Sequence, residues 1–203
     1  SIGRAGENKV LFAAIMTDGH RAFGRGGAGA VMGSKNLKAI AVNGNKTLPV
    51  ANLDELKKCA AEARKELFED EFIKVEMRKY GTPAFYDGIE EQSILPTRNW
   101  QRTTFKESIN SLGYKALDEK LEIKKYACSG CPIACGRESK IVNSNSRWEG
   151  MHGGGLEYET LAAFGSKCEV TDIYAVAASG FLANDMGLDI ISTGQAIASA
   201  MEW

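Results

Sequence analysis

The sequence predicts an α+β protein in which a short strand–glycine helix–strand unit at residues 1–44 precedes a mainly α-helical domain at residues 45–203. Three observations lead to this prediction. A short apolar run near the start is followed by a segment dense in glycine. The composition then changes to stretches rich in Lys and Glu, with apolar residues at helical spacing.

The first unit is predicted from its apolar and glycine-rich patterns. Val10–Met16 is fully apolar, which predicts a buried strand. Residues 24–35 are dense in glycine and predict a short helix. Leu37–Val42 alternates enough to predict a second strand, which the Asn43–Gly44 turn would end.

The second part is predicted from capping signals and periodicity. Asn52–Glu55 has the form of a capping box and predicts a helix that extends to Leu67. A second helix is expected from Glu69 to Tyr80, and Pro83 opens a further short one. The remaining expected elements are a short helix near Leu117–Leu121 in an otherwise irregular stretch, a strand at Lys140–Val142, a helix at Tyr158–Ser166, a helix from the N-cap Thr171 to Met186, and a helix opened by Ser192 or Thr193.

Composition excludes several classes of protein. With 25 basic and 26 acidic residues, the net charge of −1 favours neither nucleic acid nor an anionic membrane as a partner. No apolar run approaches the roughly 18 residues of a membrane span, and the first residues lack the apolar core of a signal peptide. The odd cysteine number, five, argues against a disulfide framework. We therefore expect a reducing compartment, the cytoplasm.

Three cysteines, Cys128, Cys131 and Cys135, lie within eight residues. Two cysteines three apart can reach one metal centre from a tight turn, and the third can close over it if a helical turn follows Pro132. Such spacing suits an iron–sulfur cluster, and it equally suits a zinc site with three or four thiolates. Spacing alone does not choose between these metals.

The other cysteines and both histidines carry weaker signals. Cys59 lies on a predicted helix and is expected to pack. Cys168 is expected to be a buried free thiol. His20 and His152 lie in polar, glycine-flanked segments and are interpreted as loop residues.

Residues 24–29 formally match the G-x-G-x-x-G pattern of dinucleotide-binding folds. Seven residues separate the expected strand from Gly24, however, and the following strand ends in Asn43 rather than in an acidic residue. Bare backbone N–H groups beside Arg21 and Arg25 instead suit a phosphate-bearing ligand. Close packing of a helix on a sheet explains the glycines equally well.

Two groups of carboxylates are further candidates. Glu157 and Glu159 follow the flexible run 153–155 and suit acid–base chemistry, although the sequence alone favours an ordinary acidic helix start. Gly187 is a normal helix stop. Asp189, just beyond it, either accepts N–H donors from a heterocycle or caps the next helix.

The motifs in this order resemble those of the tungsten-containing aldehyde ferredoxin oxidoreductase family. They are spread over the whole chain and are jointly very specific. The matching segments are Gly3–Asn8, Arg21–Ile40, Cys128–Cys135, Glu157–Thr160 and Gly187–Gly194.

The resemblance implies a longer enzyme in which two pterin dithiolenes hold tungsten (tungsten bis-molybdopterin, or tungstopterin) beside one Fe4S4 cluster, with Mg²⁺ bridging the pterin phosphates. It implies oxidation of a small aldehyde to a carboxylic acid with water as the oxygen source, and tungsten cycling between W(VI) and W(IV). Electrons would leave singly through the cluster to ferredoxin, and the full-length enzyme would be a homodimer. We expect this chain to be an internal segment that ends a pterin-binding β domain and begins an α-helical domain. By itself it would be inactive and would bind the cluster weakly or not at all.

Carried onto this sequence, the resemblance implies pterin contacts at Arg21, Ala22, Gly24, Arg25, Asn184, Leu188 and Asp189. It implies three cluster ligands, Cys128, Cys131 and Cys135. Glu159 would move a proton during the reaction, with Glu157 as its substitute.

There are departures from the family pattern. Asn184 stands where the best-known member has Asp, which puts one charged pterin contact in doubt. A glutamate that binds an intersubunit iron in some members falls near Ala178, so that iron is unsupported. The fourth cluster cysteine is expected beyond residue 203.

Two other functions remain open at this point. One is reduction of a carboxylate or an aromatic thioester by a related tungsten enzyme. The other is a non-catalytic module that holds structural zinc or transfers electrons.

Overall fold

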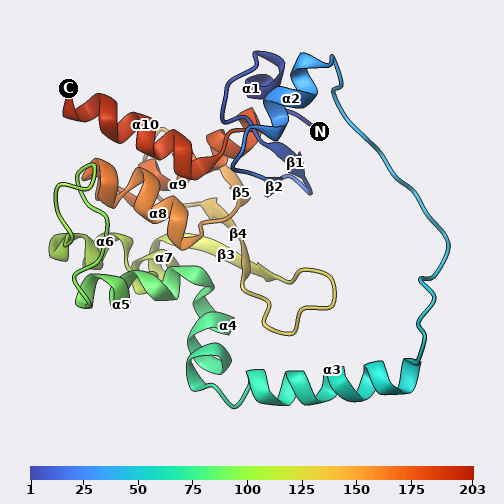
Figure 1. Ribbon diagram of the computed structural model, residues 1–203. Helices are drawn as coiled ribbons and strands as arrows, with labels where there is room; N and C mark the ends of the chain where they lie inside the picture. The colour runs from blue at the N-terminus through green and yellow to red at the C-terminus, as the bar shows by residue number, and fades with distance from the viewer.

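The computed structural model describes residues 1–203 and shows an α+β protein with two small antiparallel sheets (Figure 1). The strands are β1 (Ile15–Thr17), β2 (Arg21–Phe23), β3 (Leu121–Tyr126), β4 (Gly136–Ile141) and β5 (His152–Gly154). The α-helices are α1 (Arg4–Glu7), α2 (Ala28–Ser34), α3 (Leu53–Leu67), α4 (Arg78–Tyr80), α5 (Phe85–Glu91), α6 (Ile109–Leu112), α7 (Tyr114–Lys120), α8 (Tyr158–Phe164), α9 (Ile173–Met186) and α10 (Ile190–Glu202). A π-helix, η1 (Phe72–Met77), and three 3₁₀ turns complete the chain: η2 (Thr82–Ala84), η3 (Lys106–Ser108) and η4 (Ser166–Cys168).

The N-terminal unit is a hairpin of β1 and β2 with two short helices. Strands β1 and β2 pair antiparallel, with Met16 opposite Ala22, and the turn between them uses Gly19 at a φ of 76°. Helix α2 lies directly against α1. A Cβ added at Gly33 would lie 1.8 Å from the carbonyl oxygen of Gly6. Part of the glycine-rich segment therefore serves close helix packing.

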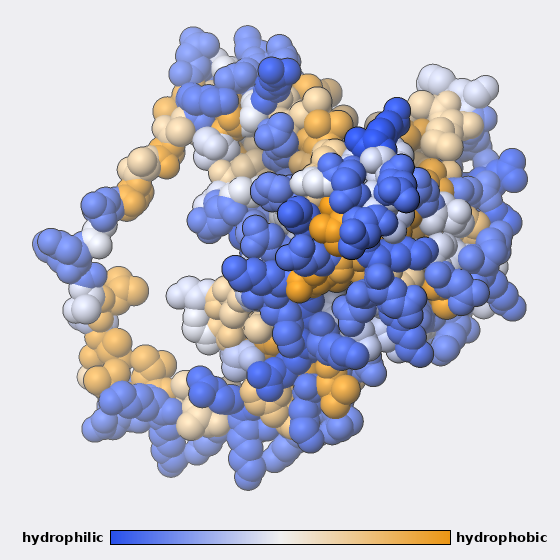
Figure 2. Space-filling view, turned by 180° about the vertical axis from the view of Figure 1, so that it is seen from behind, coloured by the Kyte–Doolittle hydropathy of each residue, from blue (hydrophilic) through white to orange (hydrophobic).

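The predicted strand Leu37–Val42 does not form. These residues belong to an extended arc that leads to α3 and stands clear of the body (Figures 1 and 2). Residues 34–66 are all exposed, with Val42 90% exposed. A strand needs a hydrogen-bonding neighbour, and the described part of the arc finds only isolated contacts, such as that from the Ile2 N–H to the Lys38 carbonyl at 2.9 Å.

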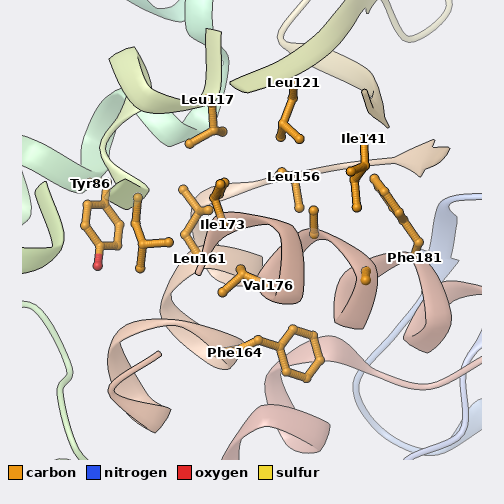
Figure 3. Close-up of a cluster of buried hydrophobic side chains, with 14 of the residues drawn as sticks. Tyr86, Leu117, Leu121, Ile141, Leu156, Leu161, Phe164, Ile173, Val176 and Phe181 are labelled. Atoms are coloured by element: carbon orange, nitrogen blue, oxygen red, sulfur yellow. The ribbon is translucent and has the colours of Figure 1, made fainter. Parts of the chain in front are cut away.

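The main core lies between α8, α9 and the sheet with strand order β3–β4–β5 (Figure 3). Helix α9 rests on the sheet through Phe181, whose ring occupies the space where Gly153 of β5 has no side chain. Each such fully buried aliphatic or aromatic side chain contributes about 1.5–3 kcal/mol. The apolar side chains that meet here include Leu117, Leu121, Ile141, Leu156, Leu161, Phe164, Ile173, Val176 and Phe181.

Most helix predictions are confirmed in position. The Asn52 side chain accepts a hydrogen bond from the Glu55 N–H and opens α3, as expected. Helix α9 begins one residue later than predicted, with Asp172 as its N-cap, because the Asp172 carboxylate accepts from the Tyr174 N–H. Helix α10 begins before Ser192, and Asp189 is its N-cap.

The strand predictions were less accurate. Of Val10–Met16 only the last two residues enter β1, and turns occupy the start. The strand expected at Lys140–Val142 is the end of the longer β4, and β3 and β5 were not predicted. The helix expected near Leu117–Leu121 lies at α7 and stops where β3 begins.

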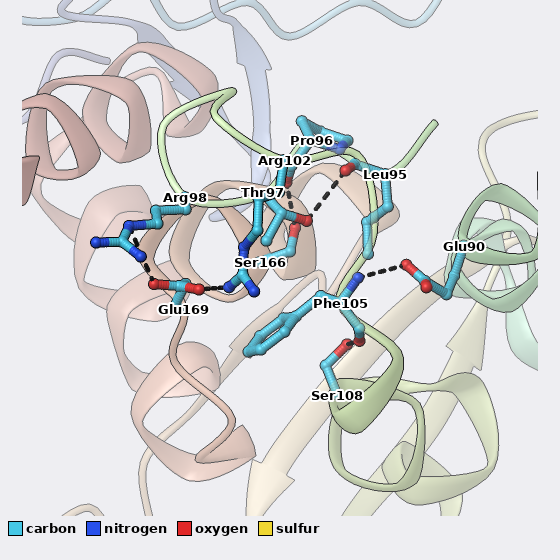
Figure 4. Close-up of polar contacts among 10 residues, drawn as sticks. All are labelled: Glu90, Leu95, Pro96, Thr97, Arg98, Arg102, Phe105, Ser108, Ser166 and Glu169. Atoms are coloured by element: carbon cyan, nitrogen blue, oxygen red, sulfur yellow. Dashed lines mark hydrogen bonds and ion pairs between the residues drawn. The ribbon is translucent and has the colours of Figure 1, made fainter. Parts of the chain in front are cut away.

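An irregular segment beside α8 is held by polar contacts (Figure 4). The Ser166 hydroxyl donates to the Pro96 carbonyl at 2.7 Å, and the Phe105 N–H donates to the buried Glu90 carboxylate at 2.7 Å. Arg98 and Arg102 both pair with Glu169. These contacts hold η4, which carries Lys167. In addition, none of the helices is long and apolar enough to cross a membrane.

Replacing Gly33 with alanine should lower the stability of the full-length protein by about 1–3 kcal/mol, as overpacking does. Alanine favours a helix over glycine by about 1 kcal/mol, but here the added methyl meets the backbone of Gly6, which no rotamer change relieves. The midpoint of denaturant unfolding measures the effect. Gly44→Ala is the control, because nothing lies within 4 Å of its Cβ position. Equal midpoints for the two variants would contradict the packing.

Candidate functional site

The hairpin β1–β2 presents the first group of predicted site residues. Arg21 and Ala22 lie on β2, and Gly24 and Arg25 follow in the turn before α2. The Arg21 Nη2 atom is buried and has no hydrogen-bond partner. An unpaired buried donor is rare and costs free energy, so this guanidinium suits a ligand that brings an oxygen acceptor.

The glycines near Arg25 divide into two groups. Gly29 and Gly33 pack so closely on other backbone that their Cβ atoms would lie 2.4 and 1.8 Å from carbonyl oxygens. Gly26 has a φ of 102° and open space around it, and Gly24 faces only the side chain of Asp189. The two interpretations of the glycine segment therefore apply to different residues. Gly29 and Gly33 allow close packing of α2, whereas Gly24 and Gly26 leave the backbone before α2 open to a ligand.

Asp189 joins the second group of site residues to the first. Its carboxylate is 7% exposed, and Oδ2 accepts from the Ser192 N–H at 2.9 Å and from the Ser192 hydroxyl at 2.5 Å. Its other oxygen, Oδ1, lies 3.3 Å from the position that a Cβ on Gly24 would occupy. Asp189 thus caps α10 with one oxygen and directs the other at the glycine segment.

Backbone hydrogen bonds hold the loop of Asp189 beside the residues that precede β1. The Asp189 N–H donates to the Phe12 carbonyl at 3.0 Å, and the Ala14 N–H donates to the Gly187 carbonyl at 2.8 Å. Leu188, between them, packs against the core. Asn184 points elsewhere, because its side-chain amide donates to the Gly154 carbonyl of β5 at 3.0 Å.

The three clustered cysteines occupy the loop between β3 and β4. Cys128 is exposed, and Cys131 and Cys135 are half-buried. The turn begins with the Cys131 N–H donating to the Cys128 carbonyl at 3.0 Å, and Gly130 and Ala134 both adopt positive φ. Burial raises the pKa of the Cys135 thiol, and the neighbouring Glu157, Cys131 and Cys128 raise it further.

A buried arginine organises the end of this loop. Arg137 is 2% exposed, and its guanidinium donates to the carbonyls of Ala134 at 2.9 Å, Gly136 at 2.8 Å and Arg78 at 3.0 Å. Arg137 is not among the site residues predicted from the sequence. Its only sequence signal is its position two residues after the last clustered cysteine.

Tyr126 connects the cysteine loop to the arginine segment. It is the last residue of β3 and pairs with Gly136. A Cβ added at Gly136 would lie only 2.5 Å from the Tyr126 ring, so the ring needs a glycine at this position. The Arg21 guanidinium lies over this ring at 5.1 Å, a cation–π distance. The His20 ring lies 4.6 Å away on the same tyrosine. Tyr126, two residues before Cys128, thus contacts both Arg21 and His20.

The two candidate glutamates have different surroundings. Glu157 accepts a hydrogen bond from the Thr82 hydroxyl at 2.5 Å, and that hydroxyl in turn accepts from the Tyr158 N–H at 2.9 Å. Glu159 is exposed at the start of α8 and forms no hydrogen bond or ion pair. Of the two carboxylates, only that of Glu159 is without a hydrogen-bond partner in the structure.

Lys167, which the sequence analysis missed, lies among three predicted site residues. Burial lowers the pKa of its ammonium, Glu159 and Asp189 act to raise it, and Arg25 lowers it further. These charges come from α8, the loop before α10 and the glycine segment. No sequence signal identified Lys167, because a lysine after a helix is normally exposed.

The other candidates were partly misjudged. Cys168 is buried and its thiol donates to the Ala163 carbonyl at 3.4 Å, as expected for a free core cysteine. Cys59 is exposed on α3, so the prediction that it packs was wrong, because α3 buries no residue. His20 lies in the turn between β1 and β2, as expected. His152 lies in β5 rather than in a loop.

The residues present fit the cofactors that the resemblance implies. The unpaired Arg21 donor and the free Asp189 oxygen suit a pterin with phosphate and ring N–H groups, and three thiols on one loop suit an iron–sulfur cluster. Over residues 1–203, no three His, Cys, Asp or Glu side chains converge at metal-binding distances. Ligation by Cys128, Cys131 and Cys135 therefore stays a prediction.

Comparisons with known proteins bear on the whole chain. Residues 1–44 match the family model "Aldehyde ferredoxin oxidoreductase, N-terminal domain", and residues 58–203 match "Aldehyde ferredoxin oxidoreductase, domains 2 & 3". The tungsten-containing aldehyde ferredoxin oxidoreductases of Pyrococcus furiosus and Thermococcus kodakarensis are 40% and 41% identical to it over 202 residues, which is 100% of this chain and 32% of each relative. The aliphatic sulfonate oxidoreductase, WOR-like subunit, of Pyrococcus furiosus is 37% identical over 205 residues, 99% of this chain and 31% of that relative.

The chain thus spans about a third of the length of these curated relatives. Two consecutive family models cover nearly all of it, and the likeness includes both the glycine segment and the cysteine loop. The chain belongs to the aldehyde ferredoxin oxidoreductase family.

Proposed function

We propose that this chain is part of a tungstopterin oxidoreductase that oxidises an aldehyde to a carboxylic acid and passes the electrons through an Fe4S4 cluster to ferredoxin. Residues 1–44 would end the pterin-binding β domain, and residues 45–203 would belong to the α-helical domain. We place the enzyme in the cytoplasm, as a homodimer with Mg²⁺ bridging the pterin phosphates.

One observation carries the proposal. Asp189 Oδ1 lies 3.3 Å from the Cβ position of Gly24, and the nearby Arg21 guanidinium lies over the ring of Tyr126, 5.1 Å from its centroid. Tyr126 ends β3 two residues before Cys128, so the predicted pterin residues lie beside the strand that leads into the cysteine loop. A two-electron site must lie near a one-electron carrier if electrons are to leave singly.

The chain's own residues would divide the work. Arg21 and Arg25 would bind the anionic part of the pterin, and Asp189 Oδ1 would accept N–H bonds from its ring. The thiolates of Cys128, Cys131 and Cys135 would hold the cluster. When bound, the tungstopterin supplies the two-electron oxidation and the cluster the single-electron transfer.

Glu159 would accept and return a proton at its carboxylate during the reaction. It is exposed and without a partner in the structure, which leaves it free for this role. Glu157 is engaged by Thr82 and would instead hold the start of α8.

Metal analysis of the full-length protein, purified without oxygen, tests the proposal. We expect tungsten with about four irons and acid-labile sulfide per chain, and aldehyde-dependent reduction of ferredoxin. Zinc as the only metal would refute it. If the enzyme turned over a sulfonate but no aldehyde, the proposed cofactors would stand and the proposed aldehyde substrate would be refuted.

A further inference from the structure

Lys167 is a lysine whose side chain is buried along most of its length. The residue is 4% exposed, and its ammonium forms no ion pair within 4 Å and no hydrogen bond. The Asn99 N–H donates to its backbone carbonyl at 2.9 Å, which fixes this part of η4. The ammonium is not among the fully buried polar atoms that lack a partner, so a buried stem carries it to an accessible surface where an anion can reach it.

The ammonium borders an open hollow of about 410 Å³. Arg25 contributes a second cation to its wall, and Ser192 and Gln195 of α10 contribute polar groups. The Trp100 ring lies 5.9 Å from the Lys167 Nζ. The hollow is large enough for a phosphate that carries a further organic body.

The first turn of α10 forms part of the same wall. Ile191 and Ser192 of this turn line the hollow, and the Asp189 carboxylate caps the turn by accepting from the Ser192 N–H at 2.9 Å. Asp189 is the nearest acidic group on this element, and its Oδ2 is already occupied by Ser192. Glu159, on α8, forms no ion pair with Lys167.

We propose that Lys167, Arg25 and the first turn of α10 form a phosphate-binding site. Two cations beside the polar side chains of Ser192 and Gln195 match the charge and the hydrogen-bonding capacity of a phosphate monoester. The phosphate comes either from the pterin, which rests on the function proposed above, or from free phosphate in solution. Lys167 is absent from the pterin contacts that the sequence resemblance implied, so its role is additional.

The test uses the full-length enzyme with Lys167→Met, which keeps the length of the side chain, and Lys167→Arg, which keeps the charge. If the site holds the pterin phosphate, Lys167→Met should retain pterin about tenfold or more weakly on dialysis, the expected loss for one charge-assisted contact. Lys167→Arg should retain most of it. Lys57→Met, an exposed change on α3, should behave as wild type.

A second arm identifies the phosphate source and guards against misfolding. Inorganic phosphate should raise the melting temperature of pterin-free wild type but not that of pterin-free Lys167→Met. If it also raises the melting temperature of the pterin-loaded wild type, the site takes free phosphate. If wild type purified from cells supplied with tungsten contains no tungsten but still responds to phosphate through Lys167, this site is upheld and the proposed function is refuted.

The opposite result overturns the inference. If the wild type holds tungstopterin, while Lys167→Met retains it equally and responds to inorganic phosphate as wild type does, Lys167 binds no phosphate. A lower melting temperature of Lys167→Met without any change in pterin retention or phosphate response would likewise assign Lys167 a purely structural role.

Discussion

Replacing Glu159 with glutamine should lower the kcat for aldehyde oxidation by the full-length enzyme about 10²–10⁴-fold, the usual contribution of one positioned acid–base group. Glutamine keeps the size and a hydrogen-bonding oxygen but cannot exchange the proton. The KM should change little, because the loss falls on the chemical step. Steady-state kinetics at saturating acceptor measures both constants, and tungsten and iron contents show whether the cofactors are still present.

Glu157→Gln is the matched control. It lies two residues away, and its carboxylate already accepts from Thr82 at 2.5 Å, an interaction that a glutamine oxygen can keep. We expect kcat within about tenfold of wild type. If Glu157→Gln lost activity and Glu159→Gln kept it, the proton-transfer role would belong to Glu157.

Serine at Cys128, Cys131 or Cys135, one at a time, should remove most of the iron and abolish ferredoxin reduction. Each thiolate is expected to hold one corner of the cluster, and a serine hydroxyl is a poor ligand for such iron. Iron content and the visible absorbance of the cluster measure the loss. Tungsten content should fall less, because the arginine and Asp189 contacts lie outside the loop.

Cys59→Ser serves as the control for loss of a thiol. Cys59 is exposed on α3, apart from the cysteine loop, so iron content and ferredoxin reduction should match those of wild type. Full iron occupancy in all three loop variants would show that the cluster is held elsewhere. If the wild type contained zinc in place of iron, the cysteine loop would instead be a structural zinc site.

The sequence predicted helices better than strands. The positions of α3, α8 and α9 follow from caps and periodicity, which act within one or two turns of the chain. Strand Leu37–Val42 was predicted from its alternation and is absent, whereas β3 and β5 were missed. A strand is decided by its partner, and β4, which pairs with both, is separated from β5 by ten residues of turns and loop.

The same contrast holds for the candidate site. The cysteine loop and the glycine segment were found in the sequence, because the residues in each are close in the chain and their chemistry depends on spacing. Lys167 and Tyr126 carried no such signal. Lys167 stands out only because the fold places it beside Arg25 at one hollow. Tyr126 stands out only because it contacts Arg21, which lies 105 positions earlier in the sequence.

By itself, the sequence determined the α+β class, the family and the residue types available for a pterin and a cluster, because caps, glycines and thiol spacing are local properties. The tertiary structure alone decided which of them meet. It brought Asp189 to Gly24, Tyr126 to Arg21 and Lys167 to Arg25, because the packing of α8, α9 and α10 on one another and of α9 on the sheet closes distances that no local pattern encodes.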